Sequence, residues 1–432
     1  MSVRRVATIT VLAVLALAVP LSTTALSAPE PSGGGAAPLQ PGPESAYRIE
    51  GLDTPTERTE VARQGVDVLG GGPDYLEVRA TPEEADRLRA AGLELVALPL
   101  PALPALSREG DFPPGFEGYH NYDELAAELR TLAETFPDVV AVSSYGQSFE
   151  NRTLPLVKIS DTVRSDENEP EVLFSCAQHA REHLTVEMCL HIIQRLAEGY
   201  GTDPAITELV GSREVWVMPV TNPDGTEYDI ASGAFAAWRK NRQPNPGVSP
   251  IGTDLNRNWG AQWNCCGGSG ANPANETYHG AGPFSAPETA QIRDWVNSRV
   301  LDGTQQITAH IDFHTYSELV LWPFGFTTDD TAPGLDAADA ATFRRLGEAM
   351  AATNGYAPQQ SSDLYITDGT IGDWMWAEHR IWSFTFEMYP NSELQGGFYP
   401  PDTEIKRETE RNDPAVDLLL DAADCVPCAT LP

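Results

Sequence analysis

The sequence predicts an α/β protein in which a single large domain has a central mixed, twisted sheet flanked by helices and is preceded by a small α/β segment. Three observations favour this fold. Strand-like and helix-like runs interleave from about residue 111 to about residue 423. The chain has 432 residues, of which 41% are hydrophobic, so it can bury a sizeable core. A proline-rich break, "LPLPALPALSREG", separates the large domain from a shorter strand-and-helix unit.

The first 28 residues have the layout of a secretory signal peptide. Arg4 and Arg5 precede an apolar run over residues 6–21, and small residues follow up to Ala28. A membrane anchor is the alternative interpretation, but the run is shorter than the roughly 20 residues of a membrane-spanning helix. We therefore expect a secreted, extracellular protein.

Residues 29–110 are predicted to form a pro-segment and linker. Residues 29–46 are rich in Pro, Gly, Ser and Ala and are expected to be unstructured. The stretch that follows, up to about residue 98, contains a strand-like "DYLEVRA" and a helix-like "TPEEADRLRAAG". A small module joined to a large domain by an exposed proline-rich linker indicates a segment that is removed on activation. A permanent accessory domain is the alternative.

The large domain is expected over residues 111–424, with residues 425–432 as a C-terminal tail. It starts with a helix, "NYDELAAELRTLAETFP", whose apolar residues recur at helical spacing. "VVAVSSYG" and "TLPLVKIS" have the pattern of strands, and "EVLFSC" is a strand that leads into the helix "TVEMCLHIIQRLAEGY". "REVWVMPVTNPDG" predicts a strand running into a turn. "ITAHIDFHTYSELVLWPFG", "APETAQIRDWVNSRV" and "RIWSFTFEMYP" extend the mixture.

The charge of the chain restricts its partners. The formal net charge is −34, and the lysines are Lys158, Lys240 and Lys406. Such an acidic surface repels the phosphates of nucleic acids and the headgroups of anionic membranes, so we expect neither as a partner.

The six cysteines fit an oxidising compartment and allow 15 pairings. We expect Cys176 to pair with Cys189, because a strand and the helix that follows it usually pack together. Cys425 and Cys428 are close enough in the sequence to pair in the tail.

The strongest chemical signal follows the strand "EVLFSC". His179 and Glu182 come just after it, and ligand sites in open α/β sheets lie beyond the carboxyl ends of strands. A spacing of three residues lets both side chains converge on one point. A catalytic zinc takes three protein ligands, so a third should come from elsewhere. His314 ends the strand "ITAHIDFH" in a similar position; the other candidates are His120, His183, His191, His279, His310 and His379.

Four separated blocks together carry a resemblance to a known family. They are "HARE", then "WRKNR" with "DLNRNW", then "HTYS", and finally "LYITDGTIGDWMW" with "FTFEMYP", and they span about residue 119 to residue 390. In this order they resemble the blocks of secreted zinc carboxypeptidases of the carboxypeptidase A and B family, close to the bacterial carboxypeptidase T type. The HExxH motif of other zinc peptidases is absent.

The resemblance implies a catalytic centre with one zinc ion per chain. His179, Glu182 and His314 would hold the zinc, whose bound water becomes a nucleophile near neutral pH. Glu387 would take the proton of this water and deliver it to the leaving amine. Arg242 would stabilise the developing oxyanion.

The resemblance also implies a site for the C-terminal carboxylate of a peptide. Arg257 suits this carboxylate because a guanidinium binds it through two parallel hydrogen bonds, and Asn256 and Tyr365 would add others. Arg181 and Arg239 would serve nearby subsites, although a structural ion pair is an alternative for Arg239. Asp254 would orient a ligating imidazole. We expect peptide or protein C-termini as substrates and a monomeric enzyme.

The loop after Tyr365 bears on specificity. Relatives that prefer Lys or Arg place an acidic residue at positions held here by Gly372 or Thr370, so a neutral pocket for aromatic or large aliphatic residues is expected. An inward-turned Asp368 would instead favour a basic residue. Alternative functions are hydrolysis of cell-wall or side-chain-linked glutamyl peptides and, in another class, a catalytically inactive zinc-binding protein.

An acidic segment raises the possibility of a second metal. "SDENEPE" concentrates carboxylates that are candidates for calcium, as the resemblance to carboxypeptidase T also suggests; a solvated acidic loop is the alternative. The residues are Asp166, Glu167, Glu169 and Glu171.

Overall fold

The computed structural model describes residues 44–99, 107–108 and 110–431. The predicted signal peptide, residues 1–28, lies outside these residues, as do parts of the predicted pro-segment and linker. The described residues belong to one compact unit of the chain. Among them, no helix is long and apolar enough to cross a membrane.

Residues 44–98 form a small α/β unit, called here the N-terminal module. Its antiparallel four-stranded sheet has the order β2-β3-β1-β4 and packs against two helices. Each helix begins at a threonine whose side chain takes part in a capping box, the arrangement that satisfies the first backbone N–H groups. The elements are β1 (Ser45–Glu50), α1 (Pro55–Ala62), β2 (Asp67–Gly71), β3 (Tyr75–Ala80), α2 (Pro82–Ala90) and β4 (Leu95–Ala97).

The large domain is built on an eight-stranded mixed sheet with the order β13-β12-β14-β11-β7-β8-β6-β5. The central strands β14, β11, β7 and β8 are parallel, whereas β12, β6 and β5 introduce antiparallel pairs. This confirms the predicted fold class. The strands are β5 (Val140–Gln147), β6 (Thr153–Ile159), β7 (Glu171–Cys176), β8 (Glu214–Met218), β11 (Ile307–Thr315), β12 (Leu319–Trp322), β13 (Ala357–Gln360) and β14 (Trp382–Met388).

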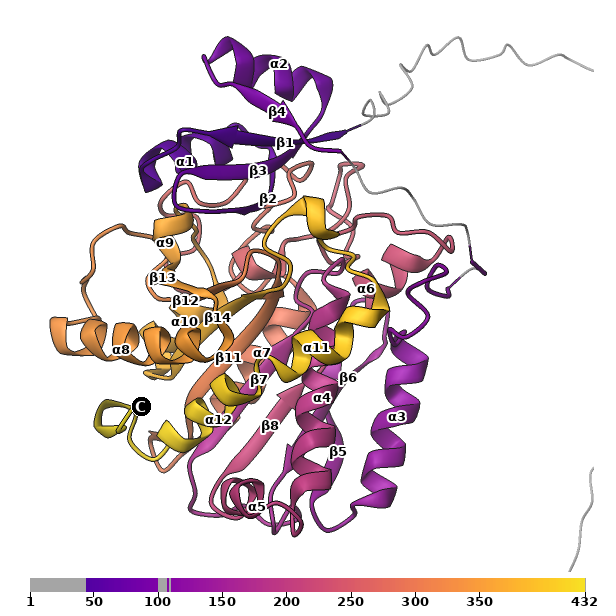
Figure 1. Ribbon diagram of the computed structural model, residues 1–432, viewed down its shortest axis with the longest axis vertical. Helices are drawn as coiled ribbons and strands as arrows, with labels where there is room; N and C mark the ends of the chain where they lie inside the picture. Colours follow the sequence, from indigo (N-terminus) through magenta and orange to yellow (C-terminus); the bar gives the residue numbers. More distant parts are fainter. Residues whose placement is uncertain (1–43, 100–106, 109, 432) are drawn as a thin grey trace, which may run out of the picture. The chain divides into compact units, whose positions relative to one another are not determined.

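Helices flank the sheet (Figure 1). One apolar core joins the sheet to α3, α4, α8 and α12, and a second joins it to α7 and α10. Because both faces of the sheet are covered, most residues of its central strands are buried. The helices are α3 (Tyr122–Thr135), α4 (His183–Gly199), α5 (Pro204–Val210), α6 (Pro223–Ile230), α7 (Pro287–Ser298), α8 (Ala337–Asn354), α9 (Ser361–Leu364), α10 (Ile371–His379), α11 (Ile405–Glu410) and α12 (Asp413–Ala422).

Two details differ from the expectations. β1 begins at Ser45, inside the stretch expected to be unstructured, because its strand pairs with both β3 and β4. "NPDG" starts helix α6 rather than a simple turn, since the Asn222 side chain caps its N-terminus and Pro223 occupies its first turn.

The cysteines form three disulfides. Cys176–Cys189 and Cys425–Cys428 confirm the predicted pairs. The third joins the adjacent residues Cys265 and Cys266. It lies in a long segment between α6 and α7, whose regular structure is mainly the short 3₁₀ turn Leu255–Arg257.

Candidate active site

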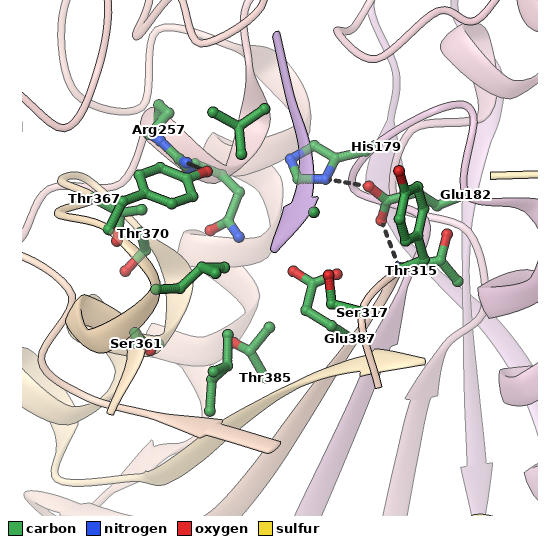
Figure 2. A pocket seen from close by; sticks show the side chains of 18 of the residues that line it. His179, Glu182, Arg257, Thr315, Ser317, Ser361, Thr367, Thr370, Thr385 and Glu387 are labelled. Atoms are coloured by element: carbon green, nitrogen blue, oxygen red, sulfur yellow. Dashed lines mark hydrogen bonds and ion pairs between the residues drawn. The ribbon is translucent and has the colours of Figure 1, made fainter. Parts of the chain in front are cut away.

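A cavity lies at the carboxyl ends of the three adjacent parallel strands β7, β11 and β14. His179 and Glu182 follow β7, His314 is near the end of β11, and Glu387 is near the end of β14. His314 and Glu387 are direct partners in the parallel register. Figure 2 shows His179, Glu182 and Glu387 around the same space. The topology of the sheet thus brings together side chains that are more than 200 residues apart.

His179, Glu182 and His314 form a buried cluster of potential metal ligands. The Nδ1 atom of His179 lies 2.8 Å from one Glu182 oxygen, and that of His314 lies 3.0 Å from the other. The two Nδ1 atoms are 3.0 Å apart. Two imidazoles and one carboxylate with a remaining open position are the donor set of catalytic zinc, so the cluster fits this ion.

The opposite nitrogen of each imidazole is held by a carboxylate. His179 Nε2 lies 3.1 Å from Asp254, and His314 Nε2 lies 2.5 Å from Asp312. These contacts place a proton on Nε2 and leave Nδ1 free to bind a metal. The sequence predicted the contact of Asp254 with an imidazole but not that of Asp312.

The turn before α4 directs the first two ligands. The Thr185 hydroxyl accepts a hydrogen bond from the Ala177 backbone N–H and donates one to the Glu182 carbonyl. The Glu182 carboxylate also accepts from the Thr315 N–H at 3.2 Å, which ties the turn to the end of β11. Because this turn is fixed from both sides, the ligands are positioned before any metal binds.

Glu387 is suited to proton transfer. Burial raises the pKa of its carboxyl to about 7, since the charged form is poorly solvated. His314 opposes this shift, whereas the charge of Glu182 adds to it. A carboxyl with a pKa in this range can both accept and release a proton near neutral pH.

A polar group faces the cavity from the irregular segment and the loop after α9. Asn256, Arg257 and Tyr365 all line it, and Arg257 donates a hydrogen bond to the Tyr365 hydroxyl at 3.1 Å. Arg257 is also held by its donation to the Gly268 carbonyl. In Figure 2, Arg257 lies across the cavity from Glu182. The structure therefore brings these three predicted residues together.

The two arginines of "WRKNR" differ in position, and the expectation for Arg242 needs correction. The Arg242 guanidinium lies over the ring of Tyr228, 3.5 Å from its centroid, and also faces Trp238. It does not line the cavity. Arg239 does line it, and two of its nitrogens donate to Asp254 at 3.1 and 2.9 Å. In this irregular segment, no periodicity in the sequence distinguishes the two side chains.

The floor of the cavity has uncharged residues at the positions singled out for specificity, Gly372 and Thr370. Thr385 and Pro323 lie beside them. Asp368 points elsewhere: its carboxylate accepts hydrogen bonds from the backbone N–H groups of Cys266 and Gly268, each at 3.0 Å. The inward orientation considered for Asp368 is therefore not observed.

One further carboxyl borders the floor. Asp373 accepts hydrogen bonds from the Gly325 N–H at 2.9 and 3.1 Å, and burial raises its pKa to about 7. Asp373 was not among the site residues predicted from the sequence. Its position directly after Gly372 in the specificity loop was the available signal.

The N-terminal module contributes to the walls of the same cavity through Val68, Leu69 and Gly70 of β2. Asp67, just before them, accepts two hydrogen bonds from Arg181 at 2.6 and 2.8 Å. A side chain at Gly70 would come within 2.6 Å of the Ser317 hydroxyl, so this approach requires glycine. In this state Arg181 binds the module and does not line the cavity.

A second contact anchors β3 of the module. The Glu77 carboxylate accepts hydrogen bonds from the Tyr316 hydroxyl at 3.0 Å and from the Glu393 N–H at 2.8 Å. Glu77 and Tyr316 are buried. The module therefore meets the rim of the cavity at several polar points.

Comparisons with known proteins agree with this geometry. Residues 125–415 match the family model described as zinc carboxypeptidase. The chain is 52% identical to a zinc carboxypeptidase from Saccharothrix mutabilis subsp. capreolus over 386 residues, which cover 87% of this chain and 88% of that protein. It is 29% identical to human carboxypeptidase B over 297 residues, 68% of each chain.

Solved structures share the fold. Carboxypeptidase A from Helicoverpa armigera superposes with a TM-score of 0.73 at 24% identity, covering 90% of this chain and 98% of that one. Thrombin activatable fibrinolysis inhibitor superposes with a TM-score of 0.68 at 20% identity, covering 89% of this chain and 100% of that one.

Proposed function

The chain belongs to the zinc carboxypeptidase family, a family of peptide hydrolases, and we propose that it is a secreted exopeptidase that removes apolar or aromatic residues from peptide C-termini. The observation that supports this most is the arrangement of one cavity. His179, Glu182 and Glu387 line one part of it, and Arg257 lies across from Glu182 (Figure 2) and lines it together with Asn256 and Tyr365. An exopeptidase needs its catalytic groups and its carboxylate-binding groups about one amino-acid residue apart, so that the last peptide bond reaches the catalytic groups.

The C-terminal carboxylate of the substrate binds Arg257. Its guanidinium offers two parallel N–H donors, and the contacts with Gly268 and Tyr365 keep the side chain directed at the cavity. The amide of Asn256 and the hydroxyl of Tyr365 add hydrogen bonds. These interactions place the last peptide bond next to Glu387 and the ligand cluster.

His179, Glu182 and His314 would hold the zinc, which when bound would supply a Lewis acid to polarise the scissile carbonyl and to make water a better nucleophile. The Glu387 carboxylate takes a proton from the attacking water and gives it to the nitrogen of the leaving residue. Arg239 carries the positive charge that stabilises the developing oxyanion, the role first assigned to Arg242. The Asp254 carboxylate holds Arg239 in place.

The floor of the cavity supports the proposed specificity. Gly372 leaves space, because a side-chain carbon at this position would meet its nearest neighbours only at 3.7 Å or more. Thr370 and Thr385 are uncharged, and Asp368 faces away. A large apolar side chain would gain about 25 cal/mol per Å² of buried surface here. A cation would face these uncharged residues, and the Asp373 carboxyl that borders the floor already accepts hydrogen bonds from the Gly325 N–H.

Residues 29–110 act as a pro-segment in this proposal. β2 lines the cavity, and Asp67 forms an ion pair with Arg181. Without this pair, Arg181 would be available to contact the substrate. The proline-rich linker at the end of this segment is the point of cleavage. Residues 111–424 form the active enzyme, a monomer.

Calcium at the acidic segment stays a prediction. Asp166 and Glu171 form ion pairs with Arg299, and the neighbouring Glu214 forms one with Lys158. These cations already balance part of the charge. A melting temperature that rises when calcium is returned to chelator-treated protein would support binding, and an unchanged one would exclude it.

A panel of blocked dipeptides tests the proposal directly. The protein trimmed to begin near residue 111 should cleave peptides that end in Phe or Leu, lose activity with a zinc chelator, and regain it with zinc. Peptides whose C-terminal carboxylate is amidated should not be cleaved. Chelator-resistant cleavage, or equal cleavage of the amidated peptides, would contradict the proposed function.

A further inference from the structure

Strand β11 carries a row of polar residues behind the active site. His310, Asp312 and His314 alternate along the strand and therefore lie on the same face of the sheet. In the register of the sheet, Asp312 is the partner of Ser175 on β7, and His310 is the partner of Ser383 on β14. These side chains are at most 1% exposed. Burial of so many polar groups is costly unless each one is hydrogen-bonded.

The side chains form one continuous chain of hydrogen bonds across three strands. The Ser383 hydroxyl lies 2.8 Å from His310 Nδ1, and His310 Nε2 lies 2.8 Å from the Ser175 hydroxyl. Ser175 is 2.5 Å from one oxygen of Asp312. The other oxygen of Asp312 lies 2.5 Å from His314 Nε2.

The donors in this chain must all point towards Asp312. The ionised carboxylate only accepts, so the single hydroxyl proton of Ser175 goes to it. His310 Nε2 must then donate to Ser175, and His310 Nδ1 accepts from the Ser383 hydroxyl. Burial lowers the pKa of His310 to about 4, which keeps the ring neutral and consistent with this order. Each polar atom of the chain finds a partner.

Asp312 has further support. The side-chain amide of Gln178 donates to the same oxygen as His314, at 2.5 Å. Among the described residues, Asp312 forms no ion pair with a lysine or arginine; its one charged contact is His314. Because the other donors to this buried carboxylate are neutral, its negative charge acts mainly on the His314 imidazole. Through this imidazole it also acts on the ligand cluster.

We propose that Ser383, His310, Ser175 and Asp312 form a positioning chain that fixes the ring orientation and tautomer of His314 and so strengthens zinc binding. The proposal rests on the ligand set of the proposed function. Asp312 holds the proton on Nε2, which leaves the Nδ1 lone pair for the metal. The outer members act through Asp312, because each hydrogen bond polarises the next.

Zinc affinity, measured by competition with a chromophoric chelator, tests the chain. Asp312→Asn should weaken zinc binding about 10- to 100-fold, because the amide lacks the charge and has only one oxygen for the three donors that Asp312 receives. Ser383→Ala, at the far end, should weaken it about 2- to 5-fold. Ser160→Ala removes another fully buried hydroxyl from the end of β6 and serves as the matched control, with unchanged affinity.

A variant that combines Asp312→Asn with Ser383→Ala tests whether the two residues act along one chain or independently. If Ser383 acts through Asp312, Ser383→Ala should have no further effect on zinc affinity in the Asp312→Asn background. Cobalt(II) supplies a second readout: its visible absorption bands should shift in Asp312→Asn and Ser383→Ala but not in Ser160→Ala. Additive losses of affinity, or unchanged cobalt bands, would overturn the proposal.

The outcomes distinguish this proposal from the proposed function. Absence of zinc binding in the unaltered protein contradicts the function itself. Normal zinc binding in the unaltered protein and in Asp312→Asn contradicts the positioning chain alone. If Asp312→Asn does not fold, Ser175→Ala and Ser383→Ala must each weaken zinc binding, and unchanged affinity in either variant would refute the chain.

Discussion

The ion pair between Asp67 and Arg181 should restrain the uncleaved protein. It joins the N-terminal module to the turn that carries the proposed zinc ligands His179 and Glu182, with two hydrogen bonds of 2.6 and 2.8 Å. The Arg181 side chain is 0% exposed and that of Asp67 is 11% exposed. Asp67→Ala removes one partner of this pair and leaves the other buried without compensation.

The size of the effect follows from the burial of the pair. Removal of one partner from a buried ion pair costs about 3–5 kcal/mol. Here the N-terminal module can move away and expose Arg181 to water. The cost of the lost ion pair therefore appears as weaker docking of the module on the large domain. A loss of about 3 kcal/mol raises the population of the open form roughly 100-fold. The contacts of Glu77 limit how far the open form can be populated, because they still hold β3 against Tyr316.

Turnover of a blocked dipeptide by the uncleaved chain measures this opening. Asp67→Ala should raise the activity by up to about 100-fold, towards that of the trimmed enzyme. The activity after trimming should equal that of the unaltered enzyme, because residue 67 has then been removed. Asp86→Ala is the matched control: it breaks an exposed pair with Arg89 within the same module and should change nothing. Equal activity of the uncleaved Asp67→Ala and unaltered chains would refute the reasoning.

Three further predictions concern the active site. Glu387→Gln should retain stoichiometric zinc while kcat falls about 10²- to 10⁴-fold, because the proton acceptor is lost; metal analysis and kcat check this, and near-normal turnover would exclude the role. Gly372→Asp should raise kcat/KM for Arg-ending relative to Phe-ending peptides by about tenfold or more, since a carboxylate fits the open floor; an unchanged ratio counts against the assigned pocket. Asp373 has a pKa raised by burial from 3.8 to about 7, so it stabilises the fold at low pH and this stability is lost as pH rises from about 4 to about 7. Asp373→Asn should remove this loss, which reaches about 4 kcal/mol of unfolding free energy. Urea unfolding at pH 5 and pH 8 measures it, and the variant should gain more over the unaltered protein at pH 8 than at pH 5. An equal difference in unfolding free energy at both pH values would show that the raised pKa is wrongly assigned.

Local patterns in the sequence predicted many of the elements and the cluster of candidate metal ligands. The helix before β5, the strands around the site and the Cys176–Cys189 disulfide follow from periodicity and from the packing of neighbouring elements. His179 and Glu182 could be identified because the three-residue spacing after an apolar strand is a local geometric constraint. His314 was predicted as the third ligand from its place at the end of another strand and from the family resemblance, and the structure places it beside His179 and Glu182.

The tertiary structure decided the features that depend on register or on irregular backbone. Arg239 and Arg242 lie three residues apart in a segment without periodicity, so only the fold shows which one faces the cavity. Asp312 reaches His314 because both lie on one face of β11, and Ser175, which is 137 residues from Asp312 in the sequence, joins them through the pairing of β7 with β11. The binding of Asp67 to Arg181 likewise required the docking of a separate module. Such contacts arise from the balance of packing over the whole chain, which no local pattern encodes.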